Sequence, residues 1–432
     1  MNTSMYSPSV YAPPLKPGTT PVVDQAGAGE KNDDILRAFN ASERRFGESF
    51  DCSTHAAVIK MMMMTFGKTP QDMFDQVRPV AGGFAITMKD EFQVQLSHDE
   101  LRQASFASRF SGADPEAVSN ANFVFAAFVK RKQVSGGHPS FEAALAKTLE
   151  GETSLRCLQG MGVYGLSQYV SAQEMVGEGV AGVLETHSRG SAFVLDGVKH
   201  SYGDRRHADQ GYGYRLFNYN AVPDATRQGR DNAAESSQRV GAKPEDIWSG
   251  FYQGAQGNCV TVSAIKAAMM RFGQSPADIY KEVAATPSGY DVVMRDGVRV
   301  SVNHDELSRA RRGALLRGSD QTLLDDANFL YAVSAKRAQL ENNDFRGNQG
   351  FDVAMDTLND GEWPGEALRR LGLFGYVRES DARELAAGAI GTLANSWHSV
   401  VVVNGVLDFY GEKHDLGSSR WMTSGLRALK LV

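Results

Sequence analysis

The chain has 432 residues, of which 42% are hydrophobic and 22% charged, and its formal net charge is −6 at pH 7. The length accommodates two or three domains, and the acidic balance argues against nucleic acid as a partner. No apolar run approaches the roughly 20 residues that cross a bilayer, so we expect no membrane span. The three cysteines, Cys52, Cys157 and Cys259, are too few and too scattered for a disulfide framework or a zinc site, which favours folding in a reducing compartment.

The first 45 residues are rich in Ser, Thr, Pro, Gly and Asn and offer few apolar side chains to bury. This composition predicts a disordered N-terminal tail. The tail lacks the basic and then apolar pattern of a cleaved signal peptide. It is similar to the uncleaved export signals of bacterial proteins that are injected into other cells. We therefore expect a secreted bacterial effector that acts in a host cytosol, or else a cytoplasmic protein.

The remainder of the chain is an internal duplication. Ser97–Leu101 returns as Asn303–Leu307, at an offset of 206 residues (303 minus 97). A period of this length excludes a solenoid, whose units have about 20–50 residues. We predict two tandem domains at residues 46–217 and 243–432, joined by a polar linker at residues 218–242.

The two copies share a predicted order of helices. In each copy a helix is expected to begin at Ser53 or Cys259 and to end at Gly67 or Gly273, where glycine suits a left-handed C-cap. A short helix follows, opened by a hydroxyl residue and a proline. In the second copy, Asp296-Gly297 then predicts the turn of a β-hairpin.

A repeated His-Asp pair follows the hairpin region and looks at first like a catalytic motif. His98-Asp99 and His304-Asp305 stand at the same place in both copies. Each pair lies between a hydroxyl or amide residue and a glutamate three residues later, the pattern of a capping box. We interpret both pairs as helix starts rather than catalytic groups.

The last third of each copy has the pattern of β-strands. His398-Ser399 and four valines lead through Asn404-Gly405 into Val406–Tyr410, which predicts a β-hairpin. Helices followed by an antiparallel sheet describe an α+β domain.

The segment Gln253–Cys259 contains the residue types that acyl transfer requires. A cysteine at a helix N-terminus lies at the positive end of the backbone dipole, which favours thiolate over thiol. A glutamine six residues earlier can donate to the oxyanion that forms when a nucleophile attacks a carbonyl group.

This segment resembles the active-site stretch of the papain-like cysteine peptidase superfamily, including its transglutaminase-like members. The resemblance implies two tandem papain-like domains. It implies that Gln253 is the oxyanion donor, Cys259 the nucleophile and His398 the general base. Val260 stands where the peptidases have an aromatic residue, so the match supports the superfamily rather than a peptidase subfamily.

The third member of a catalytic triad has three candidates, of which Asp408 is preferred. A three-residue hairpin loop would pair Val402 with Val406 and Val400 with Asp408, and Asp408 could then orient the imidazole. A two-residue loop would turn Asp408 to the other face. Asp415 and Asn404 are the reserve candidates, and we expect Asn404 to serve turn geometry.

The first copy lacks much of this set. It has Gly47 at the oxyanion position, Ser53 at the nucleophile position and His200 at the position of the acid, while His187-Ser188 parallels the histidine strand. A shift of one residue would place Cys52 at the nucleophile position. We expect this copy to be catalytically inert and to support the second copy, to recognise a partner or to regulate activity.

These residues predict a cysteine-dependent acyl-transfer hydrolase that acts on protein amides. Proteolysis, protein-glutamine deamidation and transglutamination share the same thioester step and remain open. The chemistry requires no metal and no organic cofactor. The alternative is a catalytically inactive tandem pseudo-enzyme that binds a partner protein.

Overall fold

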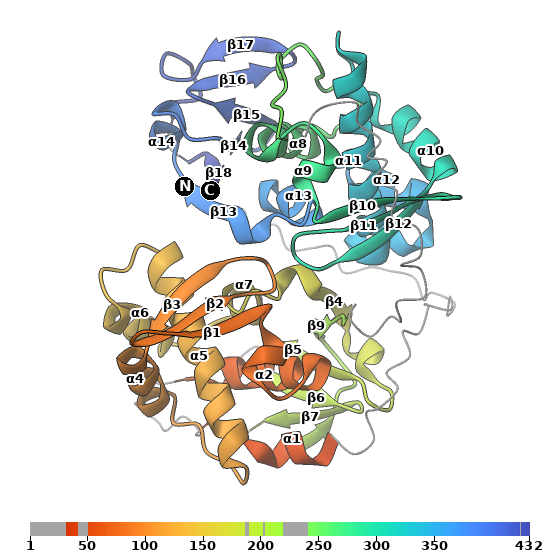
Figure 1. Cartoon of the computed structure of the whole chain (residues 1–432). Coiled ribbons are helices and arrows are strands. Elements are labelled where there is room, and N and C mark those ends of the chain that lie inside the picture. The colour runs from red at the N-terminus through yellow and green to blue at the C-terminus, as the bar shows by residue number, and fades with distance from the viewer. Residues whose placement is uncertain (1–31, 42–50, 186–189, 202–203, 219–240, 424) are drawn as a thin grey trace, which may run out of the picture.

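The computed structural model describes residues 32–41, 51–185, 190–201, 204–218, 241–423 and 425–432. It is an α+β structure with two similar halves, each with a three-stranded sheet, helices and then a six-stranded antiparallel sheet. Figure 1 shows the first half below and the second half above it. The predicted α+β class and the internal duplication are confirmed at this level.

The described helices and strands follow the same order in both halves. The helices of the first half are α1 (Asn32–Ala38), α2 (Ser53–Phe66), α3 (Pro70–Met73), α4 (His98–Ser108), α5 (Pro115–Ser135), α6 (Phe141–Thr148) and α7 (Ser154–Gly160). Those of the second half are α8 (Cys259–Phe272), α9 (Pro276–Ile279), α10 (His304–Ala314), α11 (Gln321–Leu340), α12 (Phe351–Thr357), α13 (Pro364–Arg370) and α14 (Ala382–Ala386).

The strands form two small and two large sheets. The small sheets contain β1 (Gln76–Val80), β2 (Gly83–Thr87) and β3 (Gln93–Ser97), and β10 (Glu282–Thr286), β11 (Gly289–Val293) and β12 (Arg299–Asn303). The large sheet of the first half has the order β4 (Ser167–Ser171), β9 (Tyr212–Leu216), β5 (Ala181–Glu185), β6 (Ser191–Leu195), β7 (Val198–Ser201), β8 (Asp204–His207). That of the second half has the order β13 (Val377–Ser380), β18 (Arg427–Leu431), β14 (Gly391–Ala394), β15 (Ser399–Val403), β16 (Val406–Phe409), β17 (Glu412–Asp415).

The predicted helix starts and stops agree with the structure, with one difference at the C-terminal glycines. Both leading helices begin and end where expected, and both capping boxes are formed. Gly67 and Gly273 have φ of 127° and 144°, but their ψ values of 165° and 161° are extended rather than left-handed. At Gly273 a Cβ atom would lie 2.2 Å from the Asp278 carboxylate, so both backbone angle and space require glycine there.

The prediction of a disordered tail over residues 1–45 is wrong for residues 32–41, and the first half begins before residue 46. Ile35, Ala38 and Phe39 are buried in the core, and Asn40 pairs with Ser111 through two backbone hydrogen bonds. These three apolar residues recur at helical spacing, so α1 buries one face although the surrounding composition is polar. The rest of the expected tail, and most of the expected linker, lie outside the described residues.

The large sheet of the second half separates two apolar clusters. Val401 and Val403 join the main core, which includes helix α8. Val400 and Val402 face a smaller cluster on the other side of the sheet, with α14 and Trp421. Strand β15 is therefore buried on both faces, which explains its unbroken run of valines.

The hairpin β15–β16 has a two-residue loop, so the predicted three-residue loop is wrong. Val403 pairs with Val406 and Val402 with Leu407. Asn404 and Gly405 have φ of 51° and 78°, as a primed two-residue turn requires. Asn404 thus serves turn geometry, as expected.

The two halves contact each other through equivalent groups. A buried arginine on α5 or α11 pairs with an aspartate in the loop after β2 or β11: Arg131 with Asp90 at 2.7 Å, and Arg337 with Asp296 at 2.8 Å. Arg337 also donates to the carbonyl oxygen of Gly165 in the other half, at 2.8 Å. The halves therefore meet through the same surface on each side, as two subunits do in an isologous dimer.

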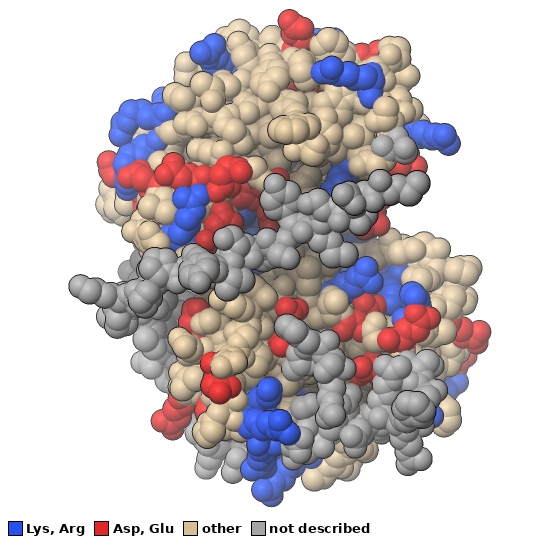
Figure 2. Space-filling model, turned by 180° about the vertical axis from the view of Figure 1, so that it is seen from behind, with Lys and Arg blue, Asp and Glu red and all other residues tan. Residues whose placement is uncertain are grey.

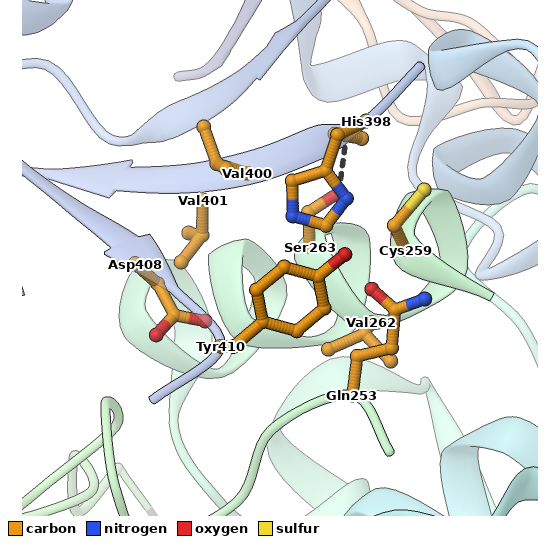
Figure 3. A pocket seen from close by; sticks show the side chains of 10 residues that line it. Gln253, Cys259, Val262, Ser263, His398, Val400, Val401, Asp408 and Tyr410 are labelled. Carbon is orange, nitrogen blue, oxygen red and sulfur yellow. Dashed lines mark hydrogen bonds between the residues drawn. The ribbon is translucent and has the colours of Figure 1, made fainter. Parts of the chain in front are cut away.

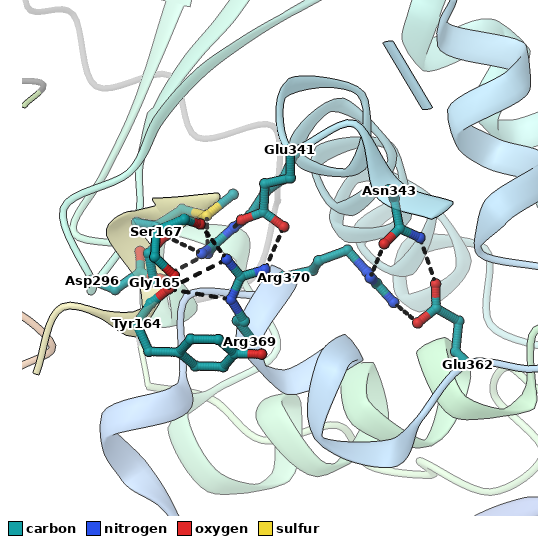
Figure 4. Close-up of polar contacts among 11 residues, drawn as sticks. Tyr164, Gly165, Ser167, Asp296, Glu341, Asn343, Glu362, Arg369 and Arg370 are labelled. Carbon is teal, nitrogen blue, oxygen red and sulfur yellow. Dashed lines mark hydrogen bonds and ion pairs between the residues drawn. The ribbon is translucent and has the colours of Figure 1, made fainter. Parts of the chain in front are cut away.

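Further contacts across this junction involve the short segments before the large sheets. The rings of Tyr164 and Phe374, one from each half, lie 4.9 Å apart. Arg369 donates to the carbonyl oxygen of Ser167 at 2.7 Å and pairs with Glu341 at 2.6 Å (Figure 4). The junction is built from buried polar groups as well as apolar ones.

The surface carries both signs of charge. On the face seen in Figure 2, basic and acidic side chains occur on each half, and acidic ones gather on the second half near the junction. Within the described part of the chain, no helix is long and apolar enough to cross a membrane.

Replacing Arg337 by Met is expected to lower the free energy of unfolding by about 3–5 kcal/mol, because it leaves Asp296 buried without its cation and removes one of the two arginines that pair with Glu341. Urea unfolding measures this change. The matched control is Arg346→Met: Arg346 pairs with Asp360, both are over 40% exposed, and its loss should cost less than about 1 kcal/mol. Equal losses for the two variants would contradict this account of the junction.

Candidate active site

Cys259, His398 and Gln253 line one small pocket in the second half. Cys259 is the first residue of α8, His398 immediately precedes β15, and Gln253 lies in the segment before α8. Figure 3 shows the sulfur and the imidazole on the same side of the pocket, with the Gln253 amide beside Cys259. The structure therefore brings all four residues predicted from the sequence to one pocket, because Asp408 also lines it.

The start of helix α8 is fixed by polar contacts to its neighbours. The side-chain nitrogen (Nδ2) of Asn258 donates to the carbonyl oxygen of Ala314 at 2.9 Å, and this side chain is buried. One turn later, the hydroxyls of Ser263 and Ser399 are 2.7 Å apart. These contacts hold Cys259 next to the residue that follows His398.

Burial and backbone dipoles act in opposite directions on the Cys259 thiol. Burial raises the pKa of this thiol above its ordinary value, while the backbone N–H groups of Ser399, Val260 and Cys259 lower it, and burial prevails. The backbone N–H groups at the helix N-terminus thus favour the thiolate, as expected, but burial outweighs them. The thiol is protonated at neutral pH and needs a base in order to react.

His398 can supply that base. Burial lowers the pKa of its imidazole, so the ring is neutral at pH 7 and able to accept a proton. The ring stacks on Tyr410 with centroids 4.7 Å apart and an angle of 14°, and it meets the edge of Phe409 at 5.6 Å. The side chain of Asn395 accepts the backbone N–H of His398 at 2.8 Å. Aromatic packing and a tight turn thus position the histidine.

The Gln253 amide lines the pocket. Its nitrogen donates to the carbonyl oxygen of Gln256 at 2.5 Å, and a primary amide retains a second N–H. The segment is anchored by Tyr252, which exchanges two backbone hydrogen bonds with Arg317. At Gly254 a Cβ atom would lie 2.0 Å from the Leu315 carbonyl oxygen, so only glycine allows this approach.

Asp408 does not contact His398 in the way predicted. Its carboxylate accepts from Lys266 Nζ at 2.7 Å and from the backbone N–H of Gly411 at 2.9 Å. Among the described residues, no hydrogen bond joins Asp408 to His398, and Figure 3 shows the carboxylate directed away from the imidazole. The physical reason is the two-residue turn, which puts Asp408 on the face toward α8, where Lys266 is fully buried.

Neither reserve candidate, Asn404 or Asp415, is hydrogen-bonded to the His398 imidazole among the described contacts. Asn404 forms the hairpin turn, and the Asp415 side chain accepts the backbone N–H of Ser418 at 2.8 Å on an exposed strand. The sequence reasoning missed Tyr410 and Lys266. One signal existed for the lysine, since Lys60 and Lys266 recur at the same place in apolar helices and a buried ammonium group requires a partner.

The first half differs at each equivalent position that the structure describes. Ser53 opens α2 as Cys259 opens α8, so the alternative that placed Cys52 at the nucleophile position is wrong. Cys52 is fully buried. The strand register puts Ser191 opposite Glu185 as Ser399 is opposite Ala394, and Gly190 therefore stands where the second half has His398.

Two further positions of the first half correspond to site residues of the second half. His200 pairs with Phe193 and holds the position of Asp408, as predicted. The strand register contradicts the alignment of Ser188 with Ser399. Gly47 and His187 lie outside the described residues.

No group of three or more His, Cys, Asp and Glu side chains within the described ranges is arranged to hold a metal ion. No family model, curated protein or solved structure matches the chain. The geometry of the site is therefore the basis for a functional assignment.

Iodoacetamide should modify Cys259 in the native protein and leave Cys52 and Cys157 unmodified until the chain unfolds, because the latter two thiols are fully buried. Since burial raises the pKa of the Cys259 thiol above its ordinary value, more thiolate forms as the pH rises, and the rate at pH 9 should exceed that at pH 7. Peptide mass spectrometry after timed quenching measures both effects. Faster labelling of Cys52 or Cys157 than of Cys259 would contradict the described burial.

Asp408→Asn should lower the free energy of unfolding by about 3–5 kcal/mol, because Lys266 loses its buried counter-ion. In the folded variant the rate of Cys259 alkylation at pH 7 should stay within about threefold of wild type, since the carboxylate does not hold the imidazole. Asp415→Asn is the exposed control for both measurements. If Asp408 orients His398, the rate will fall by as much as it does when the imidazole is removed.

Proposed function

We propose that the second half is a papain-like, cysteine-dependent acyl-transfer hydrolase that acts on protein amides, with Cys259 as nucleophile and His398 as general base. The observation that carries the proposal is the convergence of this thiol, this imidazole and the Gln253 amide on one pocket. They come from a helix N-terminus, a strand start and the preceding loop, which is the arrangement implied by the sequence resemblance.

The first chemical step is attack on an amide carbonyl. His398 takes the proton of the Cys259 thiol as sulfur forms a bond to the carbonyl carbon, and the carbonyl electrons move onto oxygen. The free N–H of Gln253 and the backbone N–H of Cys259 donate to that oxyanion. The intermediate collapses when the C–N bond breaks, and His398 transfers its proton to the departing amine.

The second step releases the acyl group. Water attacks the thioester and gives its proton to His398, and the carbon–sulfur bond then breaks to give a carboxylate and the thiol. A backbone amide substrate would make this proteolysis, and a glutamine side chain would make it deamidation. An amine in place of water would make it transglutamination.

Tyr410 replaces the acid of a triad in this proposal. A third group usually holds the base in one orientation, and here the stacked phenol ring does so by contact along the imidazole face. Asp408 acts one step further away, because it binds the backbone N–H of Gly411 within the turn that carries Tyr410. The site thus works as a Cys-His pair with aromatic support.

Two observations favour a second candidate, a tandem pseudo-enzyme that binds a partner protein. Burial raises the pKa of Cys259, and the carboxylate expected to assist His398 is bound to Lys266. A protein partner suits either function, because the net charge of −6 and the mixed surface do not favour a polyanion. The proposal of a secreted bacterial effector depends on the N-terminal composition alone.

Wild-type protein incubated with a proteome should produce new peptide N-termini or glutamine residues heavier by about 1 Da, the mass change that replacing NH by O gives. Cys259→Ala should abolish these products, while Ser53→Ala, at the equivalent place in the first half, should retain them. Quantitative mass spectrometry of termini and deamidated sites reads both chemistries together. Products that persist in Cys259→Ala, or that are lost in Ser53→Ala, would contradict the proposal.

A further inference from the structure

The first half contains a cleft of about 360 Å³ beside the position equivalent to the candidate active site. Its lining includes Glu152, Tyr169, Glu185, Gly190, Ser191 and Tyr212. Gly190 stands where the second half has His398, so the cleft borders the position equivalent to that histidine.

The strand register identifies which residues of the second half are equivalent to those that line the cleft. Gly213 pairs with Leu184 as Ala428 pairs with Leu393, so Tyr212 is equivalent to Arg427. Thr153 and Trp363 are likewise equivalent, because each is the N-cap of the helix that follows.

In the second half this place is filled by a cation on an aromatic ring. The guanidinium carbon of Arg427 lies 3.9 Å from the centre of the Trp363 ring, within the range of a cation–π contact. In the first half the smaller Thr153 replaces the indole, and a tyrosine replaces the arginine. The cleft therefore lies at the place where the other copy has this exposed guanidinium–indole pair.

The walls of the cleft suit a cation that comes from outside. Tyr169 and Tyr212 are 40% and 50% exposed, and their rings are stacked with centroids 5.8 Å apart at an angle of 19°. Exposed phenol faces attract a guanidinium group through the ring quadrupole. These two rings, which also contact Phe345 of the second half, form an aromatic wall of the cleft.

The two carboxylates of the cleft differ in their partners. Glu152 is 4% exposed and pairs with Lys132 and, at 3.7 Å, with Arg156. Glu185 accepts a hydrogen bond from the neutral Tyr169 hydroxyl at 3.3 Å. Burial raises the pKa of Glu185, and burial together with Glu185 raises the pKa of Tyr169 to about 12. A cation beside Glu185 would stabilise its charged form.

We propose that this cleft binds the guanidinium group of an arginine side chain on another protein, with Tyr212 beneath the group and Glu185 as its counter-ion. The first half is then a recognition domain whose pocket lies beside the position equivalent to the candidate active site of the other copy. This inference does not depend on the proposed hydrolase activity. Cys259→Ala should bind arginine as wild type does, so the two proposals fail separately.

The test uses the full chain and two small probes that differ in charge. N-acetyl-arginine amide mimics an arginine within a protein, and N-acetyl-citrulline amide has nearly the same shape without the charge. Titration followed by NMR shifts of the tyrosine ring signals should give saturable binding of the arginine probe. The citrulline probe should bind more weakly by about threefold to thirtyfold, the range that a cation–π contact supports.

Variants separate the roles of charge and space. Glu185→Gln should weaken the arginine probe within the same range, and Thr153→Trp should abolish binding by filling the cleft as Trp363 fills its counterpart. Glu142→Gln, an exposed glutamate of α6, is the matched control and should bind as wild type. An unchanged urea midpoint confirms that each variant is folded.

Three results would overturn the inference. The first is equal affinity for the arginine and citrulline probes. The second is unchanged binding in both Glu185→Gln and Thr153→Trp. The third is a much higher affinity for free arginine than for the amide, since the cleft would then recognise the α-amino and carboxylate groups of an amino acid rather than a side chain on a protein.

Discussion

The contact between helix α8 and strand β15 is the constraint on which the site depends. The buried hydroxyls of Ser263 and Ser399, 2.7 Å apart, join these two elements where apolar packing alone would allow them to slide. Because Cys259 begins the helix and His398 precedes the strand, fixing one contact places both reactive groups at the same pocket. An ion pair between Lys266 and Asp408 joins the same helix to the next strand of the sheet. The geometry of the candidate site is thus a consequence of how one helix is attached to one sheet.

The two halves use this framework for different ends. Both keep the leading helix, its buried lysine and the six-stranded sheet, and both meet through equivalent arginine–aspartate pairs. At the two positions of the candidate site the second half has Cys259 and His398, while the first half has Ser53 and Gly190. At the place of the guanidinium–indole pair the first half has a cleft lined by Tyr169, Tyr212 and Glu185. Under the two proposals, the duplicated fold separates chemistry from recognition without changing its core.

The sequence predicted features that depend on local pattern and failed on those that depend on tertiary contact. The exact repeat around Ser97 and Asn303 located helix starts because capping is a local interaction. The role of Asp408 was wrong because a difference of one residue in a hairpin loop turns a side chain to the other face. Helix α1 was missed because its three buried residues are diluted in a polar composition. The protonation of Cys259 could not be predicted, since it depends on burial, which opposes the helix dipole.

The central claim is that His398 acts as a base on the Cys259 thiol. The most direct test compares the second-order rate of Cys259 alkylation at pH 7 in wild type, His398→Ala and Trp397→Ala, the last being a 90% exposed neighbour that leaves the imidazole in place. General base assistance predicts a fall of at least about tenfold in His398→Ala and none in Trp397→Ala. Equal rates in all three proteins would contradict the account, because the sulfur would then react without help from the imidazole.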